Sequence, residues 1–280
     1  MQDLKGKVAV VTGAASGIGF GMAERFCAEG MRVVMADIED AALNDASKRL
    51  ADGGATVLPV VTDVSKGTSV DDLAARTFEE FGTAHVLCNN AGVATGGPMW
   101  TLTERDWAWV MGVNLWGVIH GVRAFVPRLV EQGEGHVVNT ASIAGLTSAP
   151  MMGPYNVTKH GVVTLSETLQ QELGMQGSPV GVSVLCPGWV QTRIGESDRN
   201  RPPELQDGTE SNPIGEMGKE FLKTLVDSGL PPSEVAGRVL DAIHEQRFYI
   251  LTHPEMTPMV QRRMEDILEG RTPTANFLTT

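Results

Sequence analysis

The sequence predicts an α/β fold built on a doubly wound parallel sheet of seven strands, with helices on both of its faces. Short β-branched runs alternate with longer segments of helical composition. Most of these runs are apolar without a break, as expected of parallel strands covered on both faces. A glycine-rich turn follows the first strand directly and opens a helix. Together these observations indicate a Rossmann-type sheet.

The predicted elements repeat as strand–helix units along most of the chain. The strands cover residues 8–12, 32–36, 56–61, 84–89, 136–141, 180–186 and 248–252. The helices cover residues 17–29, 40–51, 70–81, 104–130 and 155–173. Such repetition implies right-handed crossovers between neighbouring parallel strands.

The length of 280 residues predicts one α/β domain over residues 1–280. A stretch rich in Pro, Gly, Asn and charge is too long for a plain connector, so we expect a substrate lid at about residues 193–230. A C-terminal extension follows at about residues 253–280. It is too short for the second, sugar-nucleotide domain that a dehydratase or epimerase on this fold usually carries.

Composition excludes several classes of partner. The net charge of −12 argues against a nucleic-acid surface and against binding to anionic lipid. The N-terminus has no signal-peptide pattern, and no apolar run of membrane-spanning length is evident. The cysteines (Cys27, Cys88 and Cys186) fit neither a disulfide framework nor a zinc site, and the histidines lack metal-ligand spacing. We therefore expect a cytoplasmic protein without a metal, and buried strand positions for Cys88 and Cys186.

The glycine-rich turn predicts a nucleotide site. Glycines permit a tight turn and close approach of the backbone to a pyrophosphate, and the helix that follows favours its negative charge. The spacing is G-x-x-x-G-x-G, and glycine spacing alone is a weak signal. The position at the first strand–helix junction strengthens the prediction. The residues predicted to contact the cofactor here are Gly13, Ser16, Gly17, Ile18 and Gly19.

Asp37 ends the second predicted strand, where a carboxylate can accept hydrogen bonds from the adenosine ribose hydroxyls. The same charge would repel the 2′-phosphate of NADP, and the next residue, Ile38, offers that phosphate no cation. The sequence therefore predicts NAD in preference to NADP. The alternative interpretation is that Asp37 caps the following helix.

Two further strands end in polar residues at the edge where ligands bind in such sheets. Asp63 and Val64 follow the third strand, and Asn90, Ala91 and Gly92 follow the fourth. For Asp63, a turn or helix cap is at least as good an explanation as ligand contact. Asn90 and Gly92 could likewise serve only the turn.

Tyr155 and Lys159 suggest the chemistry. On a helix they lie about 6 Å apart along the axis and on nearly one face. A phenol has a pKa near 10, so work as an acid or base near pH 7 requires a pKa about 3 lower. An adjacent ammonium supplies part of that change. A tyrosine and a lysine at this spacing can also occur by chance, in which case they are two ordinary side chains on a helix face without a catalytic role.

Two other polar residues support a catalytic interpretation. Ser142 directly follows the fifth predicted strand, where its hydroxyl could bond a substrate oxygen. Asn114 lies within the predicted helix 104–130, an unfavourable place for asparagine unless it has a specific task. Its side chain could hold a water near the lysine and so conduct protons.

The ordered set of motifs resembles the short-chain dehydrogenase/reductase family over roughly residues 5–252. The matching motifs are TGxxxGIG at 12–19, NNAG at 89–92, Asn114, Ser142, YxxxK at 155–159, and Pro187-Gly188 with Thr192. The serine precedes the tyrosine by 13 residues, as is usual in the family. Each motif alone is weak, whereas the set in this order is highly specific.

The resemblance implies a role for each matching residue. Tyr155 would be the general acid/base, and Lys159 would lower its pKa and hold the nicotinamide ribose. Ser142 would polarise the substrate oxygen, and Asn114 would position a relay water. Thr12 and Asn89 would link strands instead of touching the cofactor. The remaining cofactor contacts would fall to Asn90 near the adenosine ribose, Asp63 and Val64 near the adenine, and Pro187, Gly188, Val190 and Thr192 around the nicotinamide.

The predicted substrate pocket is apolar and adaptable, which indicates a fairly hydrophobic secondary alcohol or ketone. Its predicted lining beyond Ser142 and Tyr155 consists of Ala94, Ile143, Met151, Met152 and Trp189. Some of these side chains could instead pack under the lid or at an interface.

Helices 104–130 and 155–173 carry apolar residues on more than one face, which suggests a symmetric homo-oligomer. The residues concerned are Trp107, Trp109, Trp116, Val162, Val163 and Leu165. The family resemblance implies a tetramer or a dimer through these helices. The leading function is thus an NAD-dependent alcohol dehydrogenase or ketone reductase. The alternatives are a non-catalytic NAD-sensing protein and an NADP-preferring ketone reductase.

Overall fold

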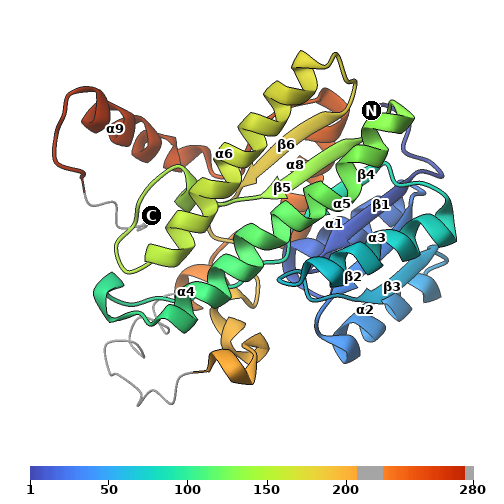
Figure 1. Ribbon diagram of the computed structural model, residues 1–280, viewed down its shortest axis with the longest axis horizontal. Helices are drawn as coiled ribbons and strands as arrows, with labels where there is room; N and C mark the ends of the chain where they lie inside the picture. The colour runs from blue at the N-terminus through green and yellow to red at the C-terminus, as the bar shows by residue number, and fades with distance from the viewer. Residues whose placement is uncertain (207–222, 275–280) are drawn as a thin grey trace.

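Seven parallel strands form one twisted sheet in the computed structural model, which describes residues 1–206 and 223–274 (Figure 1). The strands are β1 (Val8–Thr12), β2 (Arg32–Asp37), β3 (Val57–Val61), β4 (Val86–Asn89), β5 (His136–Thr140), β6 (Gly181–Cys186) and β7 (Tyr249–Leu251). Their order in the sheet is β3-β2-β1-β4-β5-β6-β7. Strands β2 and β3 are added on one side of β1 and strands β4 to β7 on the other, so the strand order reverses between β1 and β4. The predicted fold class and all seven strands are confirmed.

Helices cover both faces of the sheet, because alternate residues of each buried strand point to opposite sides. In β1, Ala9 and Val11 pack with α1 (Gly17–Ala28), α2 (Asp40–Asp52) and α8 (Pro232–Glu245). Val8 and Val10 pack on the other face with α3 (Gly67–Phe81), α5 (Gly117–Gln132) and α6 (Gly153–Met175). Cys88 and Cys186 are buried in or at the end of strands and carry free thiols, as predicted.

The predicted helix 104–130 is a continuous helical stretch with an irregular middle. α4 (Glu104–Met111) passes into a π-helical turn, η2 (Gly112–Trp116), and then into α5. By length and composition alone, the stretch Glu104–Gln132 could cross a membrane, because an 18-residue window within it has a mean hydropathy of 1.2, and 44% of that window is buried. A helix in the core of a globular protein meets the same test, so this stretch does not contradict the expectation of no membrane-spanning segment. The α5 portion packs Phe125 and Leu129 into the core, as a helix covering a sheet does.

Several apolar residues assigned to an oligomer surface are instead buried within the subunit. Trp109, Val162 and Val163 are each at most 5% exposed. Trp109 packs in a small cluster with Val93 and Leu205, whereas Val162 and Val163 pack beside β5 and β6. A sequence pattern alone cannot separate such inward positions from an outer helix face. Trp116 remains 51% exposed. The argument for an oligomer was therefore wrong for Trp109, Val162 and Val163, which are not surface residues.

The chain after β6 holds elements that the strand–helix rhythm did not reveal. Two short 3₁₀ segments, η4 (Ile194–Asn200) and η5 (Pro203–Leu205), form the described beginning of the predicted lid. Residues 207–222 of that lid lie outside the described residues. After β7 the chain continues through η6 (Pro254–Met256) into α9 (Thr257–Leu268), which stands apart from the sheet at the left of Figure 1. Neither α8 nor α9 was predicted.

Candidate active site

One cavity opens at the carboxyl ends of the central strands, around the point where the strand order reverses. This is the place where open α/β sheets bind ligands. Most residues predicted to bind cofactor or substrate line it. They are Gly13, Ser16, Gly17, Ile18, Asp37, Ile38, Asp63, Val64, Asn90, Ala91, Gly92, Ala94, Ser142, Ile143, Met152, Tyr155, Lys159, Pro187, Gly188, Trp189, Val190 and Thr192. Gly19, Asn114 and Met151 are not part of its wall.

The glycine loop is shaped by close backbone contacts. Gly13 has a φ of +67°, and a Cβ there would lie 2.9 Å from the Cα atom of Ala91. A Cβ on Gly19 would overlap the carbonyl oxygen of Gly13, so Gly19 serves the packing of α1 and does not face the cavity. Ser16 precedes α1 without capping it through its side chain. The loop thus presents a helix N-terminus to the cavity, as a pyrophosphate site requires.

Asp37 braces the glycine loop from the end of β2. Its Oδ2 atom accepts a hydrogen bond from the Ala15 N–H at 3.0 Å, and Oδ1 accepts one from the Glu39 N–H at 3.0 Å. Burial raises the pKa of Asp37, and these backbone N–H groups partly offset the effect. The N-cap residue of α2 is Glu39, so the interpretation of Asp37 as that cap was wrong. Its carboxylate lines the cavity.

The polar residues after β3 and β4 also have structural tasks. Asp63 accepts hydrogen bonds from the backbone and hydroxyl of Ser65, so the turn interpretation is confirmed. Asn90 donates to the Thr12 carbonyl oxygen at 2.9 Å and accepts from Thr140 at 3.2 Å. Thr12 in turn accepts from the backbone of Asn90 and so links β1 to β4, as predicted. These bonds fix the walls against which a nucleotide would lie.

Tyr155 and Lys159 project from α6 toward the cavity. The Lys159 Nζ atom lies 5.4 Å from the centre of the Tyr155 ring and donates a hydrogen bond to the Thr140 carbonyl at 2.9 Å. Lys159 is 3% exposed, and burial lowers its pKa to about 8. The side chain therefore still carries its charge at neutral pH. This places an ammonium beside the phenol, as the sequence predicted.

Ser142 completes the group of reactive side chains. It follows β5 at the start of η3 (Ile143–Gly145), where its hydroxyl accepts from the Ala144 N–H at 3.1 Å and donates to the Pro187 carbonyl at 3.3 Å. Burial raises the pKa of Tyr155, and a hydrogen bond with Ser142 lowers it. Both side chains line the cavity.

Asn114 occupies the π-helical turn behind this group and is fully buried. Its Oδ1 atom accepts from the Val93 N–H at 2.8 Å, and Nδ2 donates to the Val93 carbonyl at 2.9 Å. A Cβ on Gly92 would lie 3.5 Å from Oδ1 and 3.6 Å from the Lys159 Nζ atom, so the three residues adjoin. The side chain holds the loop after β4. Its role toward a relay water stays a prediction.

Part of the cavity wall is apolar. Met152 and Ile143 line it as predicted, together with Trp109, Val113 and Val226, which sequence reasoning missed. Met151 is 45% exposed with a φ of +67°, and its side chain does not reach the wall. The prediction for Met151 was wrong because its unusual backbone turns it away from its neighbour Met152.

Other missed wall residues come from segments distant in sequence. Glu39, Arg199 and Asn200 line the same cavity as Asp37. No local pattern relates position 39 to position 199. Another missed residue, His253, accepts a hydrogen bond from the Gly188 N–H at 3.0 Å and so supports the wall from behind. Within the described part of the chain, no three His, Cys, Asp or Glu side chains gather as metal ligands.

Comparison with known proteins agrees with this geometry. Residues 7–203 match the family model described as short chain dehydrogenase. The chain is 36% identical to a "CLA biosynthesis dehydrogenase/reductase" of Lactiplantibacillus plantarum, covering 99% of both chains. It is 35% identical to a "1-deoxy-11-beta-hydroxypentalenate dehydrogenase" of Streptomyces avermitilis, covering 94% of this chain and 91% of that one.

A solved structure extends the likeness to three dimensions. A short chain dehydrogenase/reductase from Burkholderia phymatum, in complex with NAD, is 46% identical and superposes with a TM-score of 0.97. The superposition covers 99% of both chains. With this fold, these motifs and these relatives, the chain belongs to the short-chain dehydrogenase/reductase family of oxidoreductases.

Proposed function

We propose that this protein transfers a hydride between NAD(H) and the carbinol or carbonyl carbon of a fairly hydrophobic secondary alcohol or ketone. One observation carries the proposal: Ser142, Tyr155 and Lys159 line the same cavity as the glycine loop and Asp37. A cofactor that spans from Asp37 to Lys159 would bring its reactive end to the tyrosine.

The residues suit acid/base chemistry on an alcohol. Ser142 would hold the substrate hydroxyl beside Tyr155, whose phenolate would accept the hydroxyl proton during oxidation. Lys159 would stabilise that phenolate and hold the nicotinamide ribose. When bound, NAD⁺ supplies the hydride acceptor at C4 of its nicotinamide. In the reduction direction, Tyr155 would return the proton to the carbonyl oxygen.

The adenosine end of the cavity favours NAD over NADP. The carboxylate of Asp37 lines it, and negative charge there opposes a 2′-phosphate. The complex of the Burkholderia phymatum relative with NAD supports the same preference. Arg193 and Arg199 lie nearby, but each is paired with a glutamate. An NADP-preferring reductase of the same family is therefore the less favoured alternative.

The apolar wall supports a hydrophobic substrate. Trp109, Val113, Ile143 and Met152 offer contact area and no charge. One relative is named for a hydroxylated substrate and another for CLA biosynthesis, which is consistent with substrates of this character. We place the reaction in the cytoplasm, in a homotetramer or homodimer. Exposed Trp116 and Val157 on helices of the usual family interface support that assembly.

A non-catalytic NAD sensor is the alternative from another class. Such a protein would be expected to lack part of the Ser–Tyr–Lys set, and this chain retains all of it. A fluorescence screen for NADH formation from NAD⁺ and a panel of secondary alcohols, steroids, terpenoids and acyl-chain hydroxy compounds separates the two. Turnover of at least one hydrophobic alcohol is expected. Binding of NADH with no turnover across the panel would favour the sensor.

A further inference from the structure

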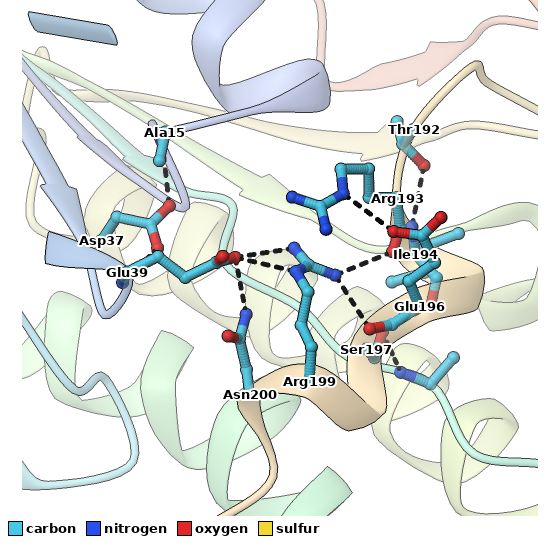
Figure 2. A network of polar contacts seen from close by, with 11 residues as sticks. Ala15, Asp37, Glu39, Thr192, Arg193, Ile194, Glu196, Ser197, Arg199 and Asn200 are labelled. Carbon is cyan, nitrogen blue, oxygen red and sulfur yellow. Dashed lines mark hydrogen bonds and ion pairs between the residues drawn. The ribbon is translucent and has the colours of Figure 1, made fainter. Parts of the chain in front are cut away.

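The 3₁₀ segment η4 is held against both sides of the cavity mouth. The Ala94 N–H, in the loop after β4, donates to the Ser197 hydroxyl at 3.2 Å. On the other side, Glu39 beyond β2 accepts three hydrogen bonds on its Oε1 atom. The donors are Arg199 Nε at 3.0 Å, Arg199 Nη2 at 2.7 Å and Asn200 Nδ2 at 2.9 Å. Figure 2 shows Glu39 reaching across to Arg199 and Asn200.

The Arg199 guanidinium is also fixed from its own segment. Its Nη1 atom donates to the backbone carbonyls of Arg193 at 3.1 Å and Glu196 at 3.0 Å. These bonds orient the Arg199 guanidinium toward Glu39. Little side-chain conformational entropy is therefore lost when the ion pair forms. Glu39, Arg199 and Asn200 together are called the clasp below.

The clasp is better shielded from solvent than the neighbouring ion pair. The side chains of Glu39 and Arg199 are 23% and 25% exposed, whereas those of Glu196 and Arg193 are 60% and 52% exposed. Burial opposes ionisation of Glu39, but hydrogen bonds from Arg199 and Asn200 hold its pKa below the usual value. Shielded, charge-assisted pairs of this kind are stronger than exposed ones.

The cavity runs beneath the clasp. Its wall includes Asp37 and Glu39 on one side and Ile194, Ser197, Arg199 and Asn200 on the other. The Glu39 N–H donates to Asp37, so the clasp begins two residues from the carboxylate proposed to bind the adenosine ribose. A dinucleotide whose adenosine end reaches Asp37 would lie under η4. The clasp would then block its dissociation from the cavity.

We propose that Glu39 and Arg199 retain the cofactor, by clasping η4 over the adenosine half of the bound dinucleotide. The inference rests on the proposed NAD-dependent function. Neither side chain touches the reacting atoms, so both are positioning residues. Opening the clasp would let the dinucleotide leave. Closing it would add contacts between η4 and the bound dinucleotide. The pair would therefore act mainly on the dissociation rate.

The test measures NADH release directly. NADH bound to the full-length protein is displaced by excess NAD⁺ in a stopped-flow fluorimeter, for wild type, Glu39→Gln, Arg199→Gln and the double variant. We expect each single variant to release NADH about tenfold faster, as for the loss of one shielded ion pair. Because both changes break the same contact, the double variant should be little faster than the singles.

Glu196→Gln is the matched control. Like Glu39→Gln, it replaces a glutamate that is paired with an arginine, but it breaks only the local pair between Glu196 and Arg193, the residue before η4, and Glu196 does not line the cavity. Thermal unfolding of every variant confirms that it is folded. Release rates of the clasp variants equal to that of Glu196→Gln, or effects that simply multiply in the double variant, would overturn the proposal. If the wild type fails to bind NADH at all, the proposed function has failed instead.

Discussion

The Lys159 Nζ atom lies 5.4 Å from the centre of the Tyr155 ring, one helical turn further along α6. Burial acts on the two groups in opposite directions, because it raises the pKa of the phenol and lowers that of the ammonium to about 8. At this distance, a charge on Lys159 would favour the ionised form of Tyr155 and so oppose the effect of burial on the phenol. This coupling leads to the first prediction.

Replacing Lys159 by Met should move the pH dependence of alcohol oxidation. The rate should rise with pH as Tyr155 loses its proton, and the Lys159 charge that assists this loss is present below about pH 8. Without the ammonium, the acid limb of kcat/KM should move about 1–3 pH units higher. A rate profile under rate-limiting chemistry measures this. An unchanged acid limb in Lys159→Met, or a flat wild-type profile from pH 6 to 10, would contradict the assigned role.

Replacing Asp37 by Ala should narrow the preference for NAD over NADP by about tenfold or more, because it removes a charge that opposes the 2′-phosphate. Fluorescence titration with NADH and NADPH gives the ratio of dissociation constants. Asp40→Ala is the matched control, since it removes a carboxylate from the first turn of α2 that does not line the cavity. A wild-type protein that prefers NADPH would remove the basis of this assignment.

Replacing Gly13 by Ala should destabilise the protein and weaken NADH binding together. The new Cβ would meet the Ala91 backbone at 2.9 Å, in addition to the cost of a φ of +67°. Gly82→Ala is the control, because Gly82 has a similar φ of +73° with nothing within 4 Å of a Cβ. The free energy of unfolding in urea should fall by about 1 kcal/mol for Gly82→Ala and by about 2–4 kcal/mol for Gly13→Ala. Equal losses would show that the contact with Ala91 is unimportant.

The buried imidazole of His136 should make stability fall in acid. His136 is 1% exposed, contacts Ser183 at 2.8 Å, and has a pKa lowered to about 4 by burial. The unfolded chain binds this proton near pH 6.5 and the folded protein near pH 4, so stability is lost as pH falls between those values. The loss from this group reaches about 3 kcal/mol. In His136→Gln, urea unfolding at pH 4–7 should lack that part of the acid dependence.

The sequence predicted those features that depend on local pattern. Unbroken apolar runs located the strands, since the central ones are buried on both faces. The order of strand ends placed Ser142, Asp37 and the glycine loop at one edge. Tyr155 and Lys159 could be paired because helical spacing is regular.

Contacts between distant segments could not be predicted in this way. Glu39 and Arg199 are 160 residues apart, and neither position has a pattern that points to the other. The burial of Trp109 was not predictable, because it depends on Val93 and on the distant segment that holds Arg201 and Leu205. The π-helical turn at Asn114 likewise depends on the hydrogen bonds to Val93, which lies in another loop.

The most direct test of the central claim compares Tyr155→Phe with wild type in a single turnover. Enzyme saturated with NAD⁺ is mixed with an active secondary alcohol, and NADH formation is followed by fluorescence. Removing one hydroxyl should lower the rate of the chemical step by at least about 10³-fold, while NADH binds as tightly as before. A rate within about tenfold of wild type would contradict the assignment of Tyr155 as the general acid/base.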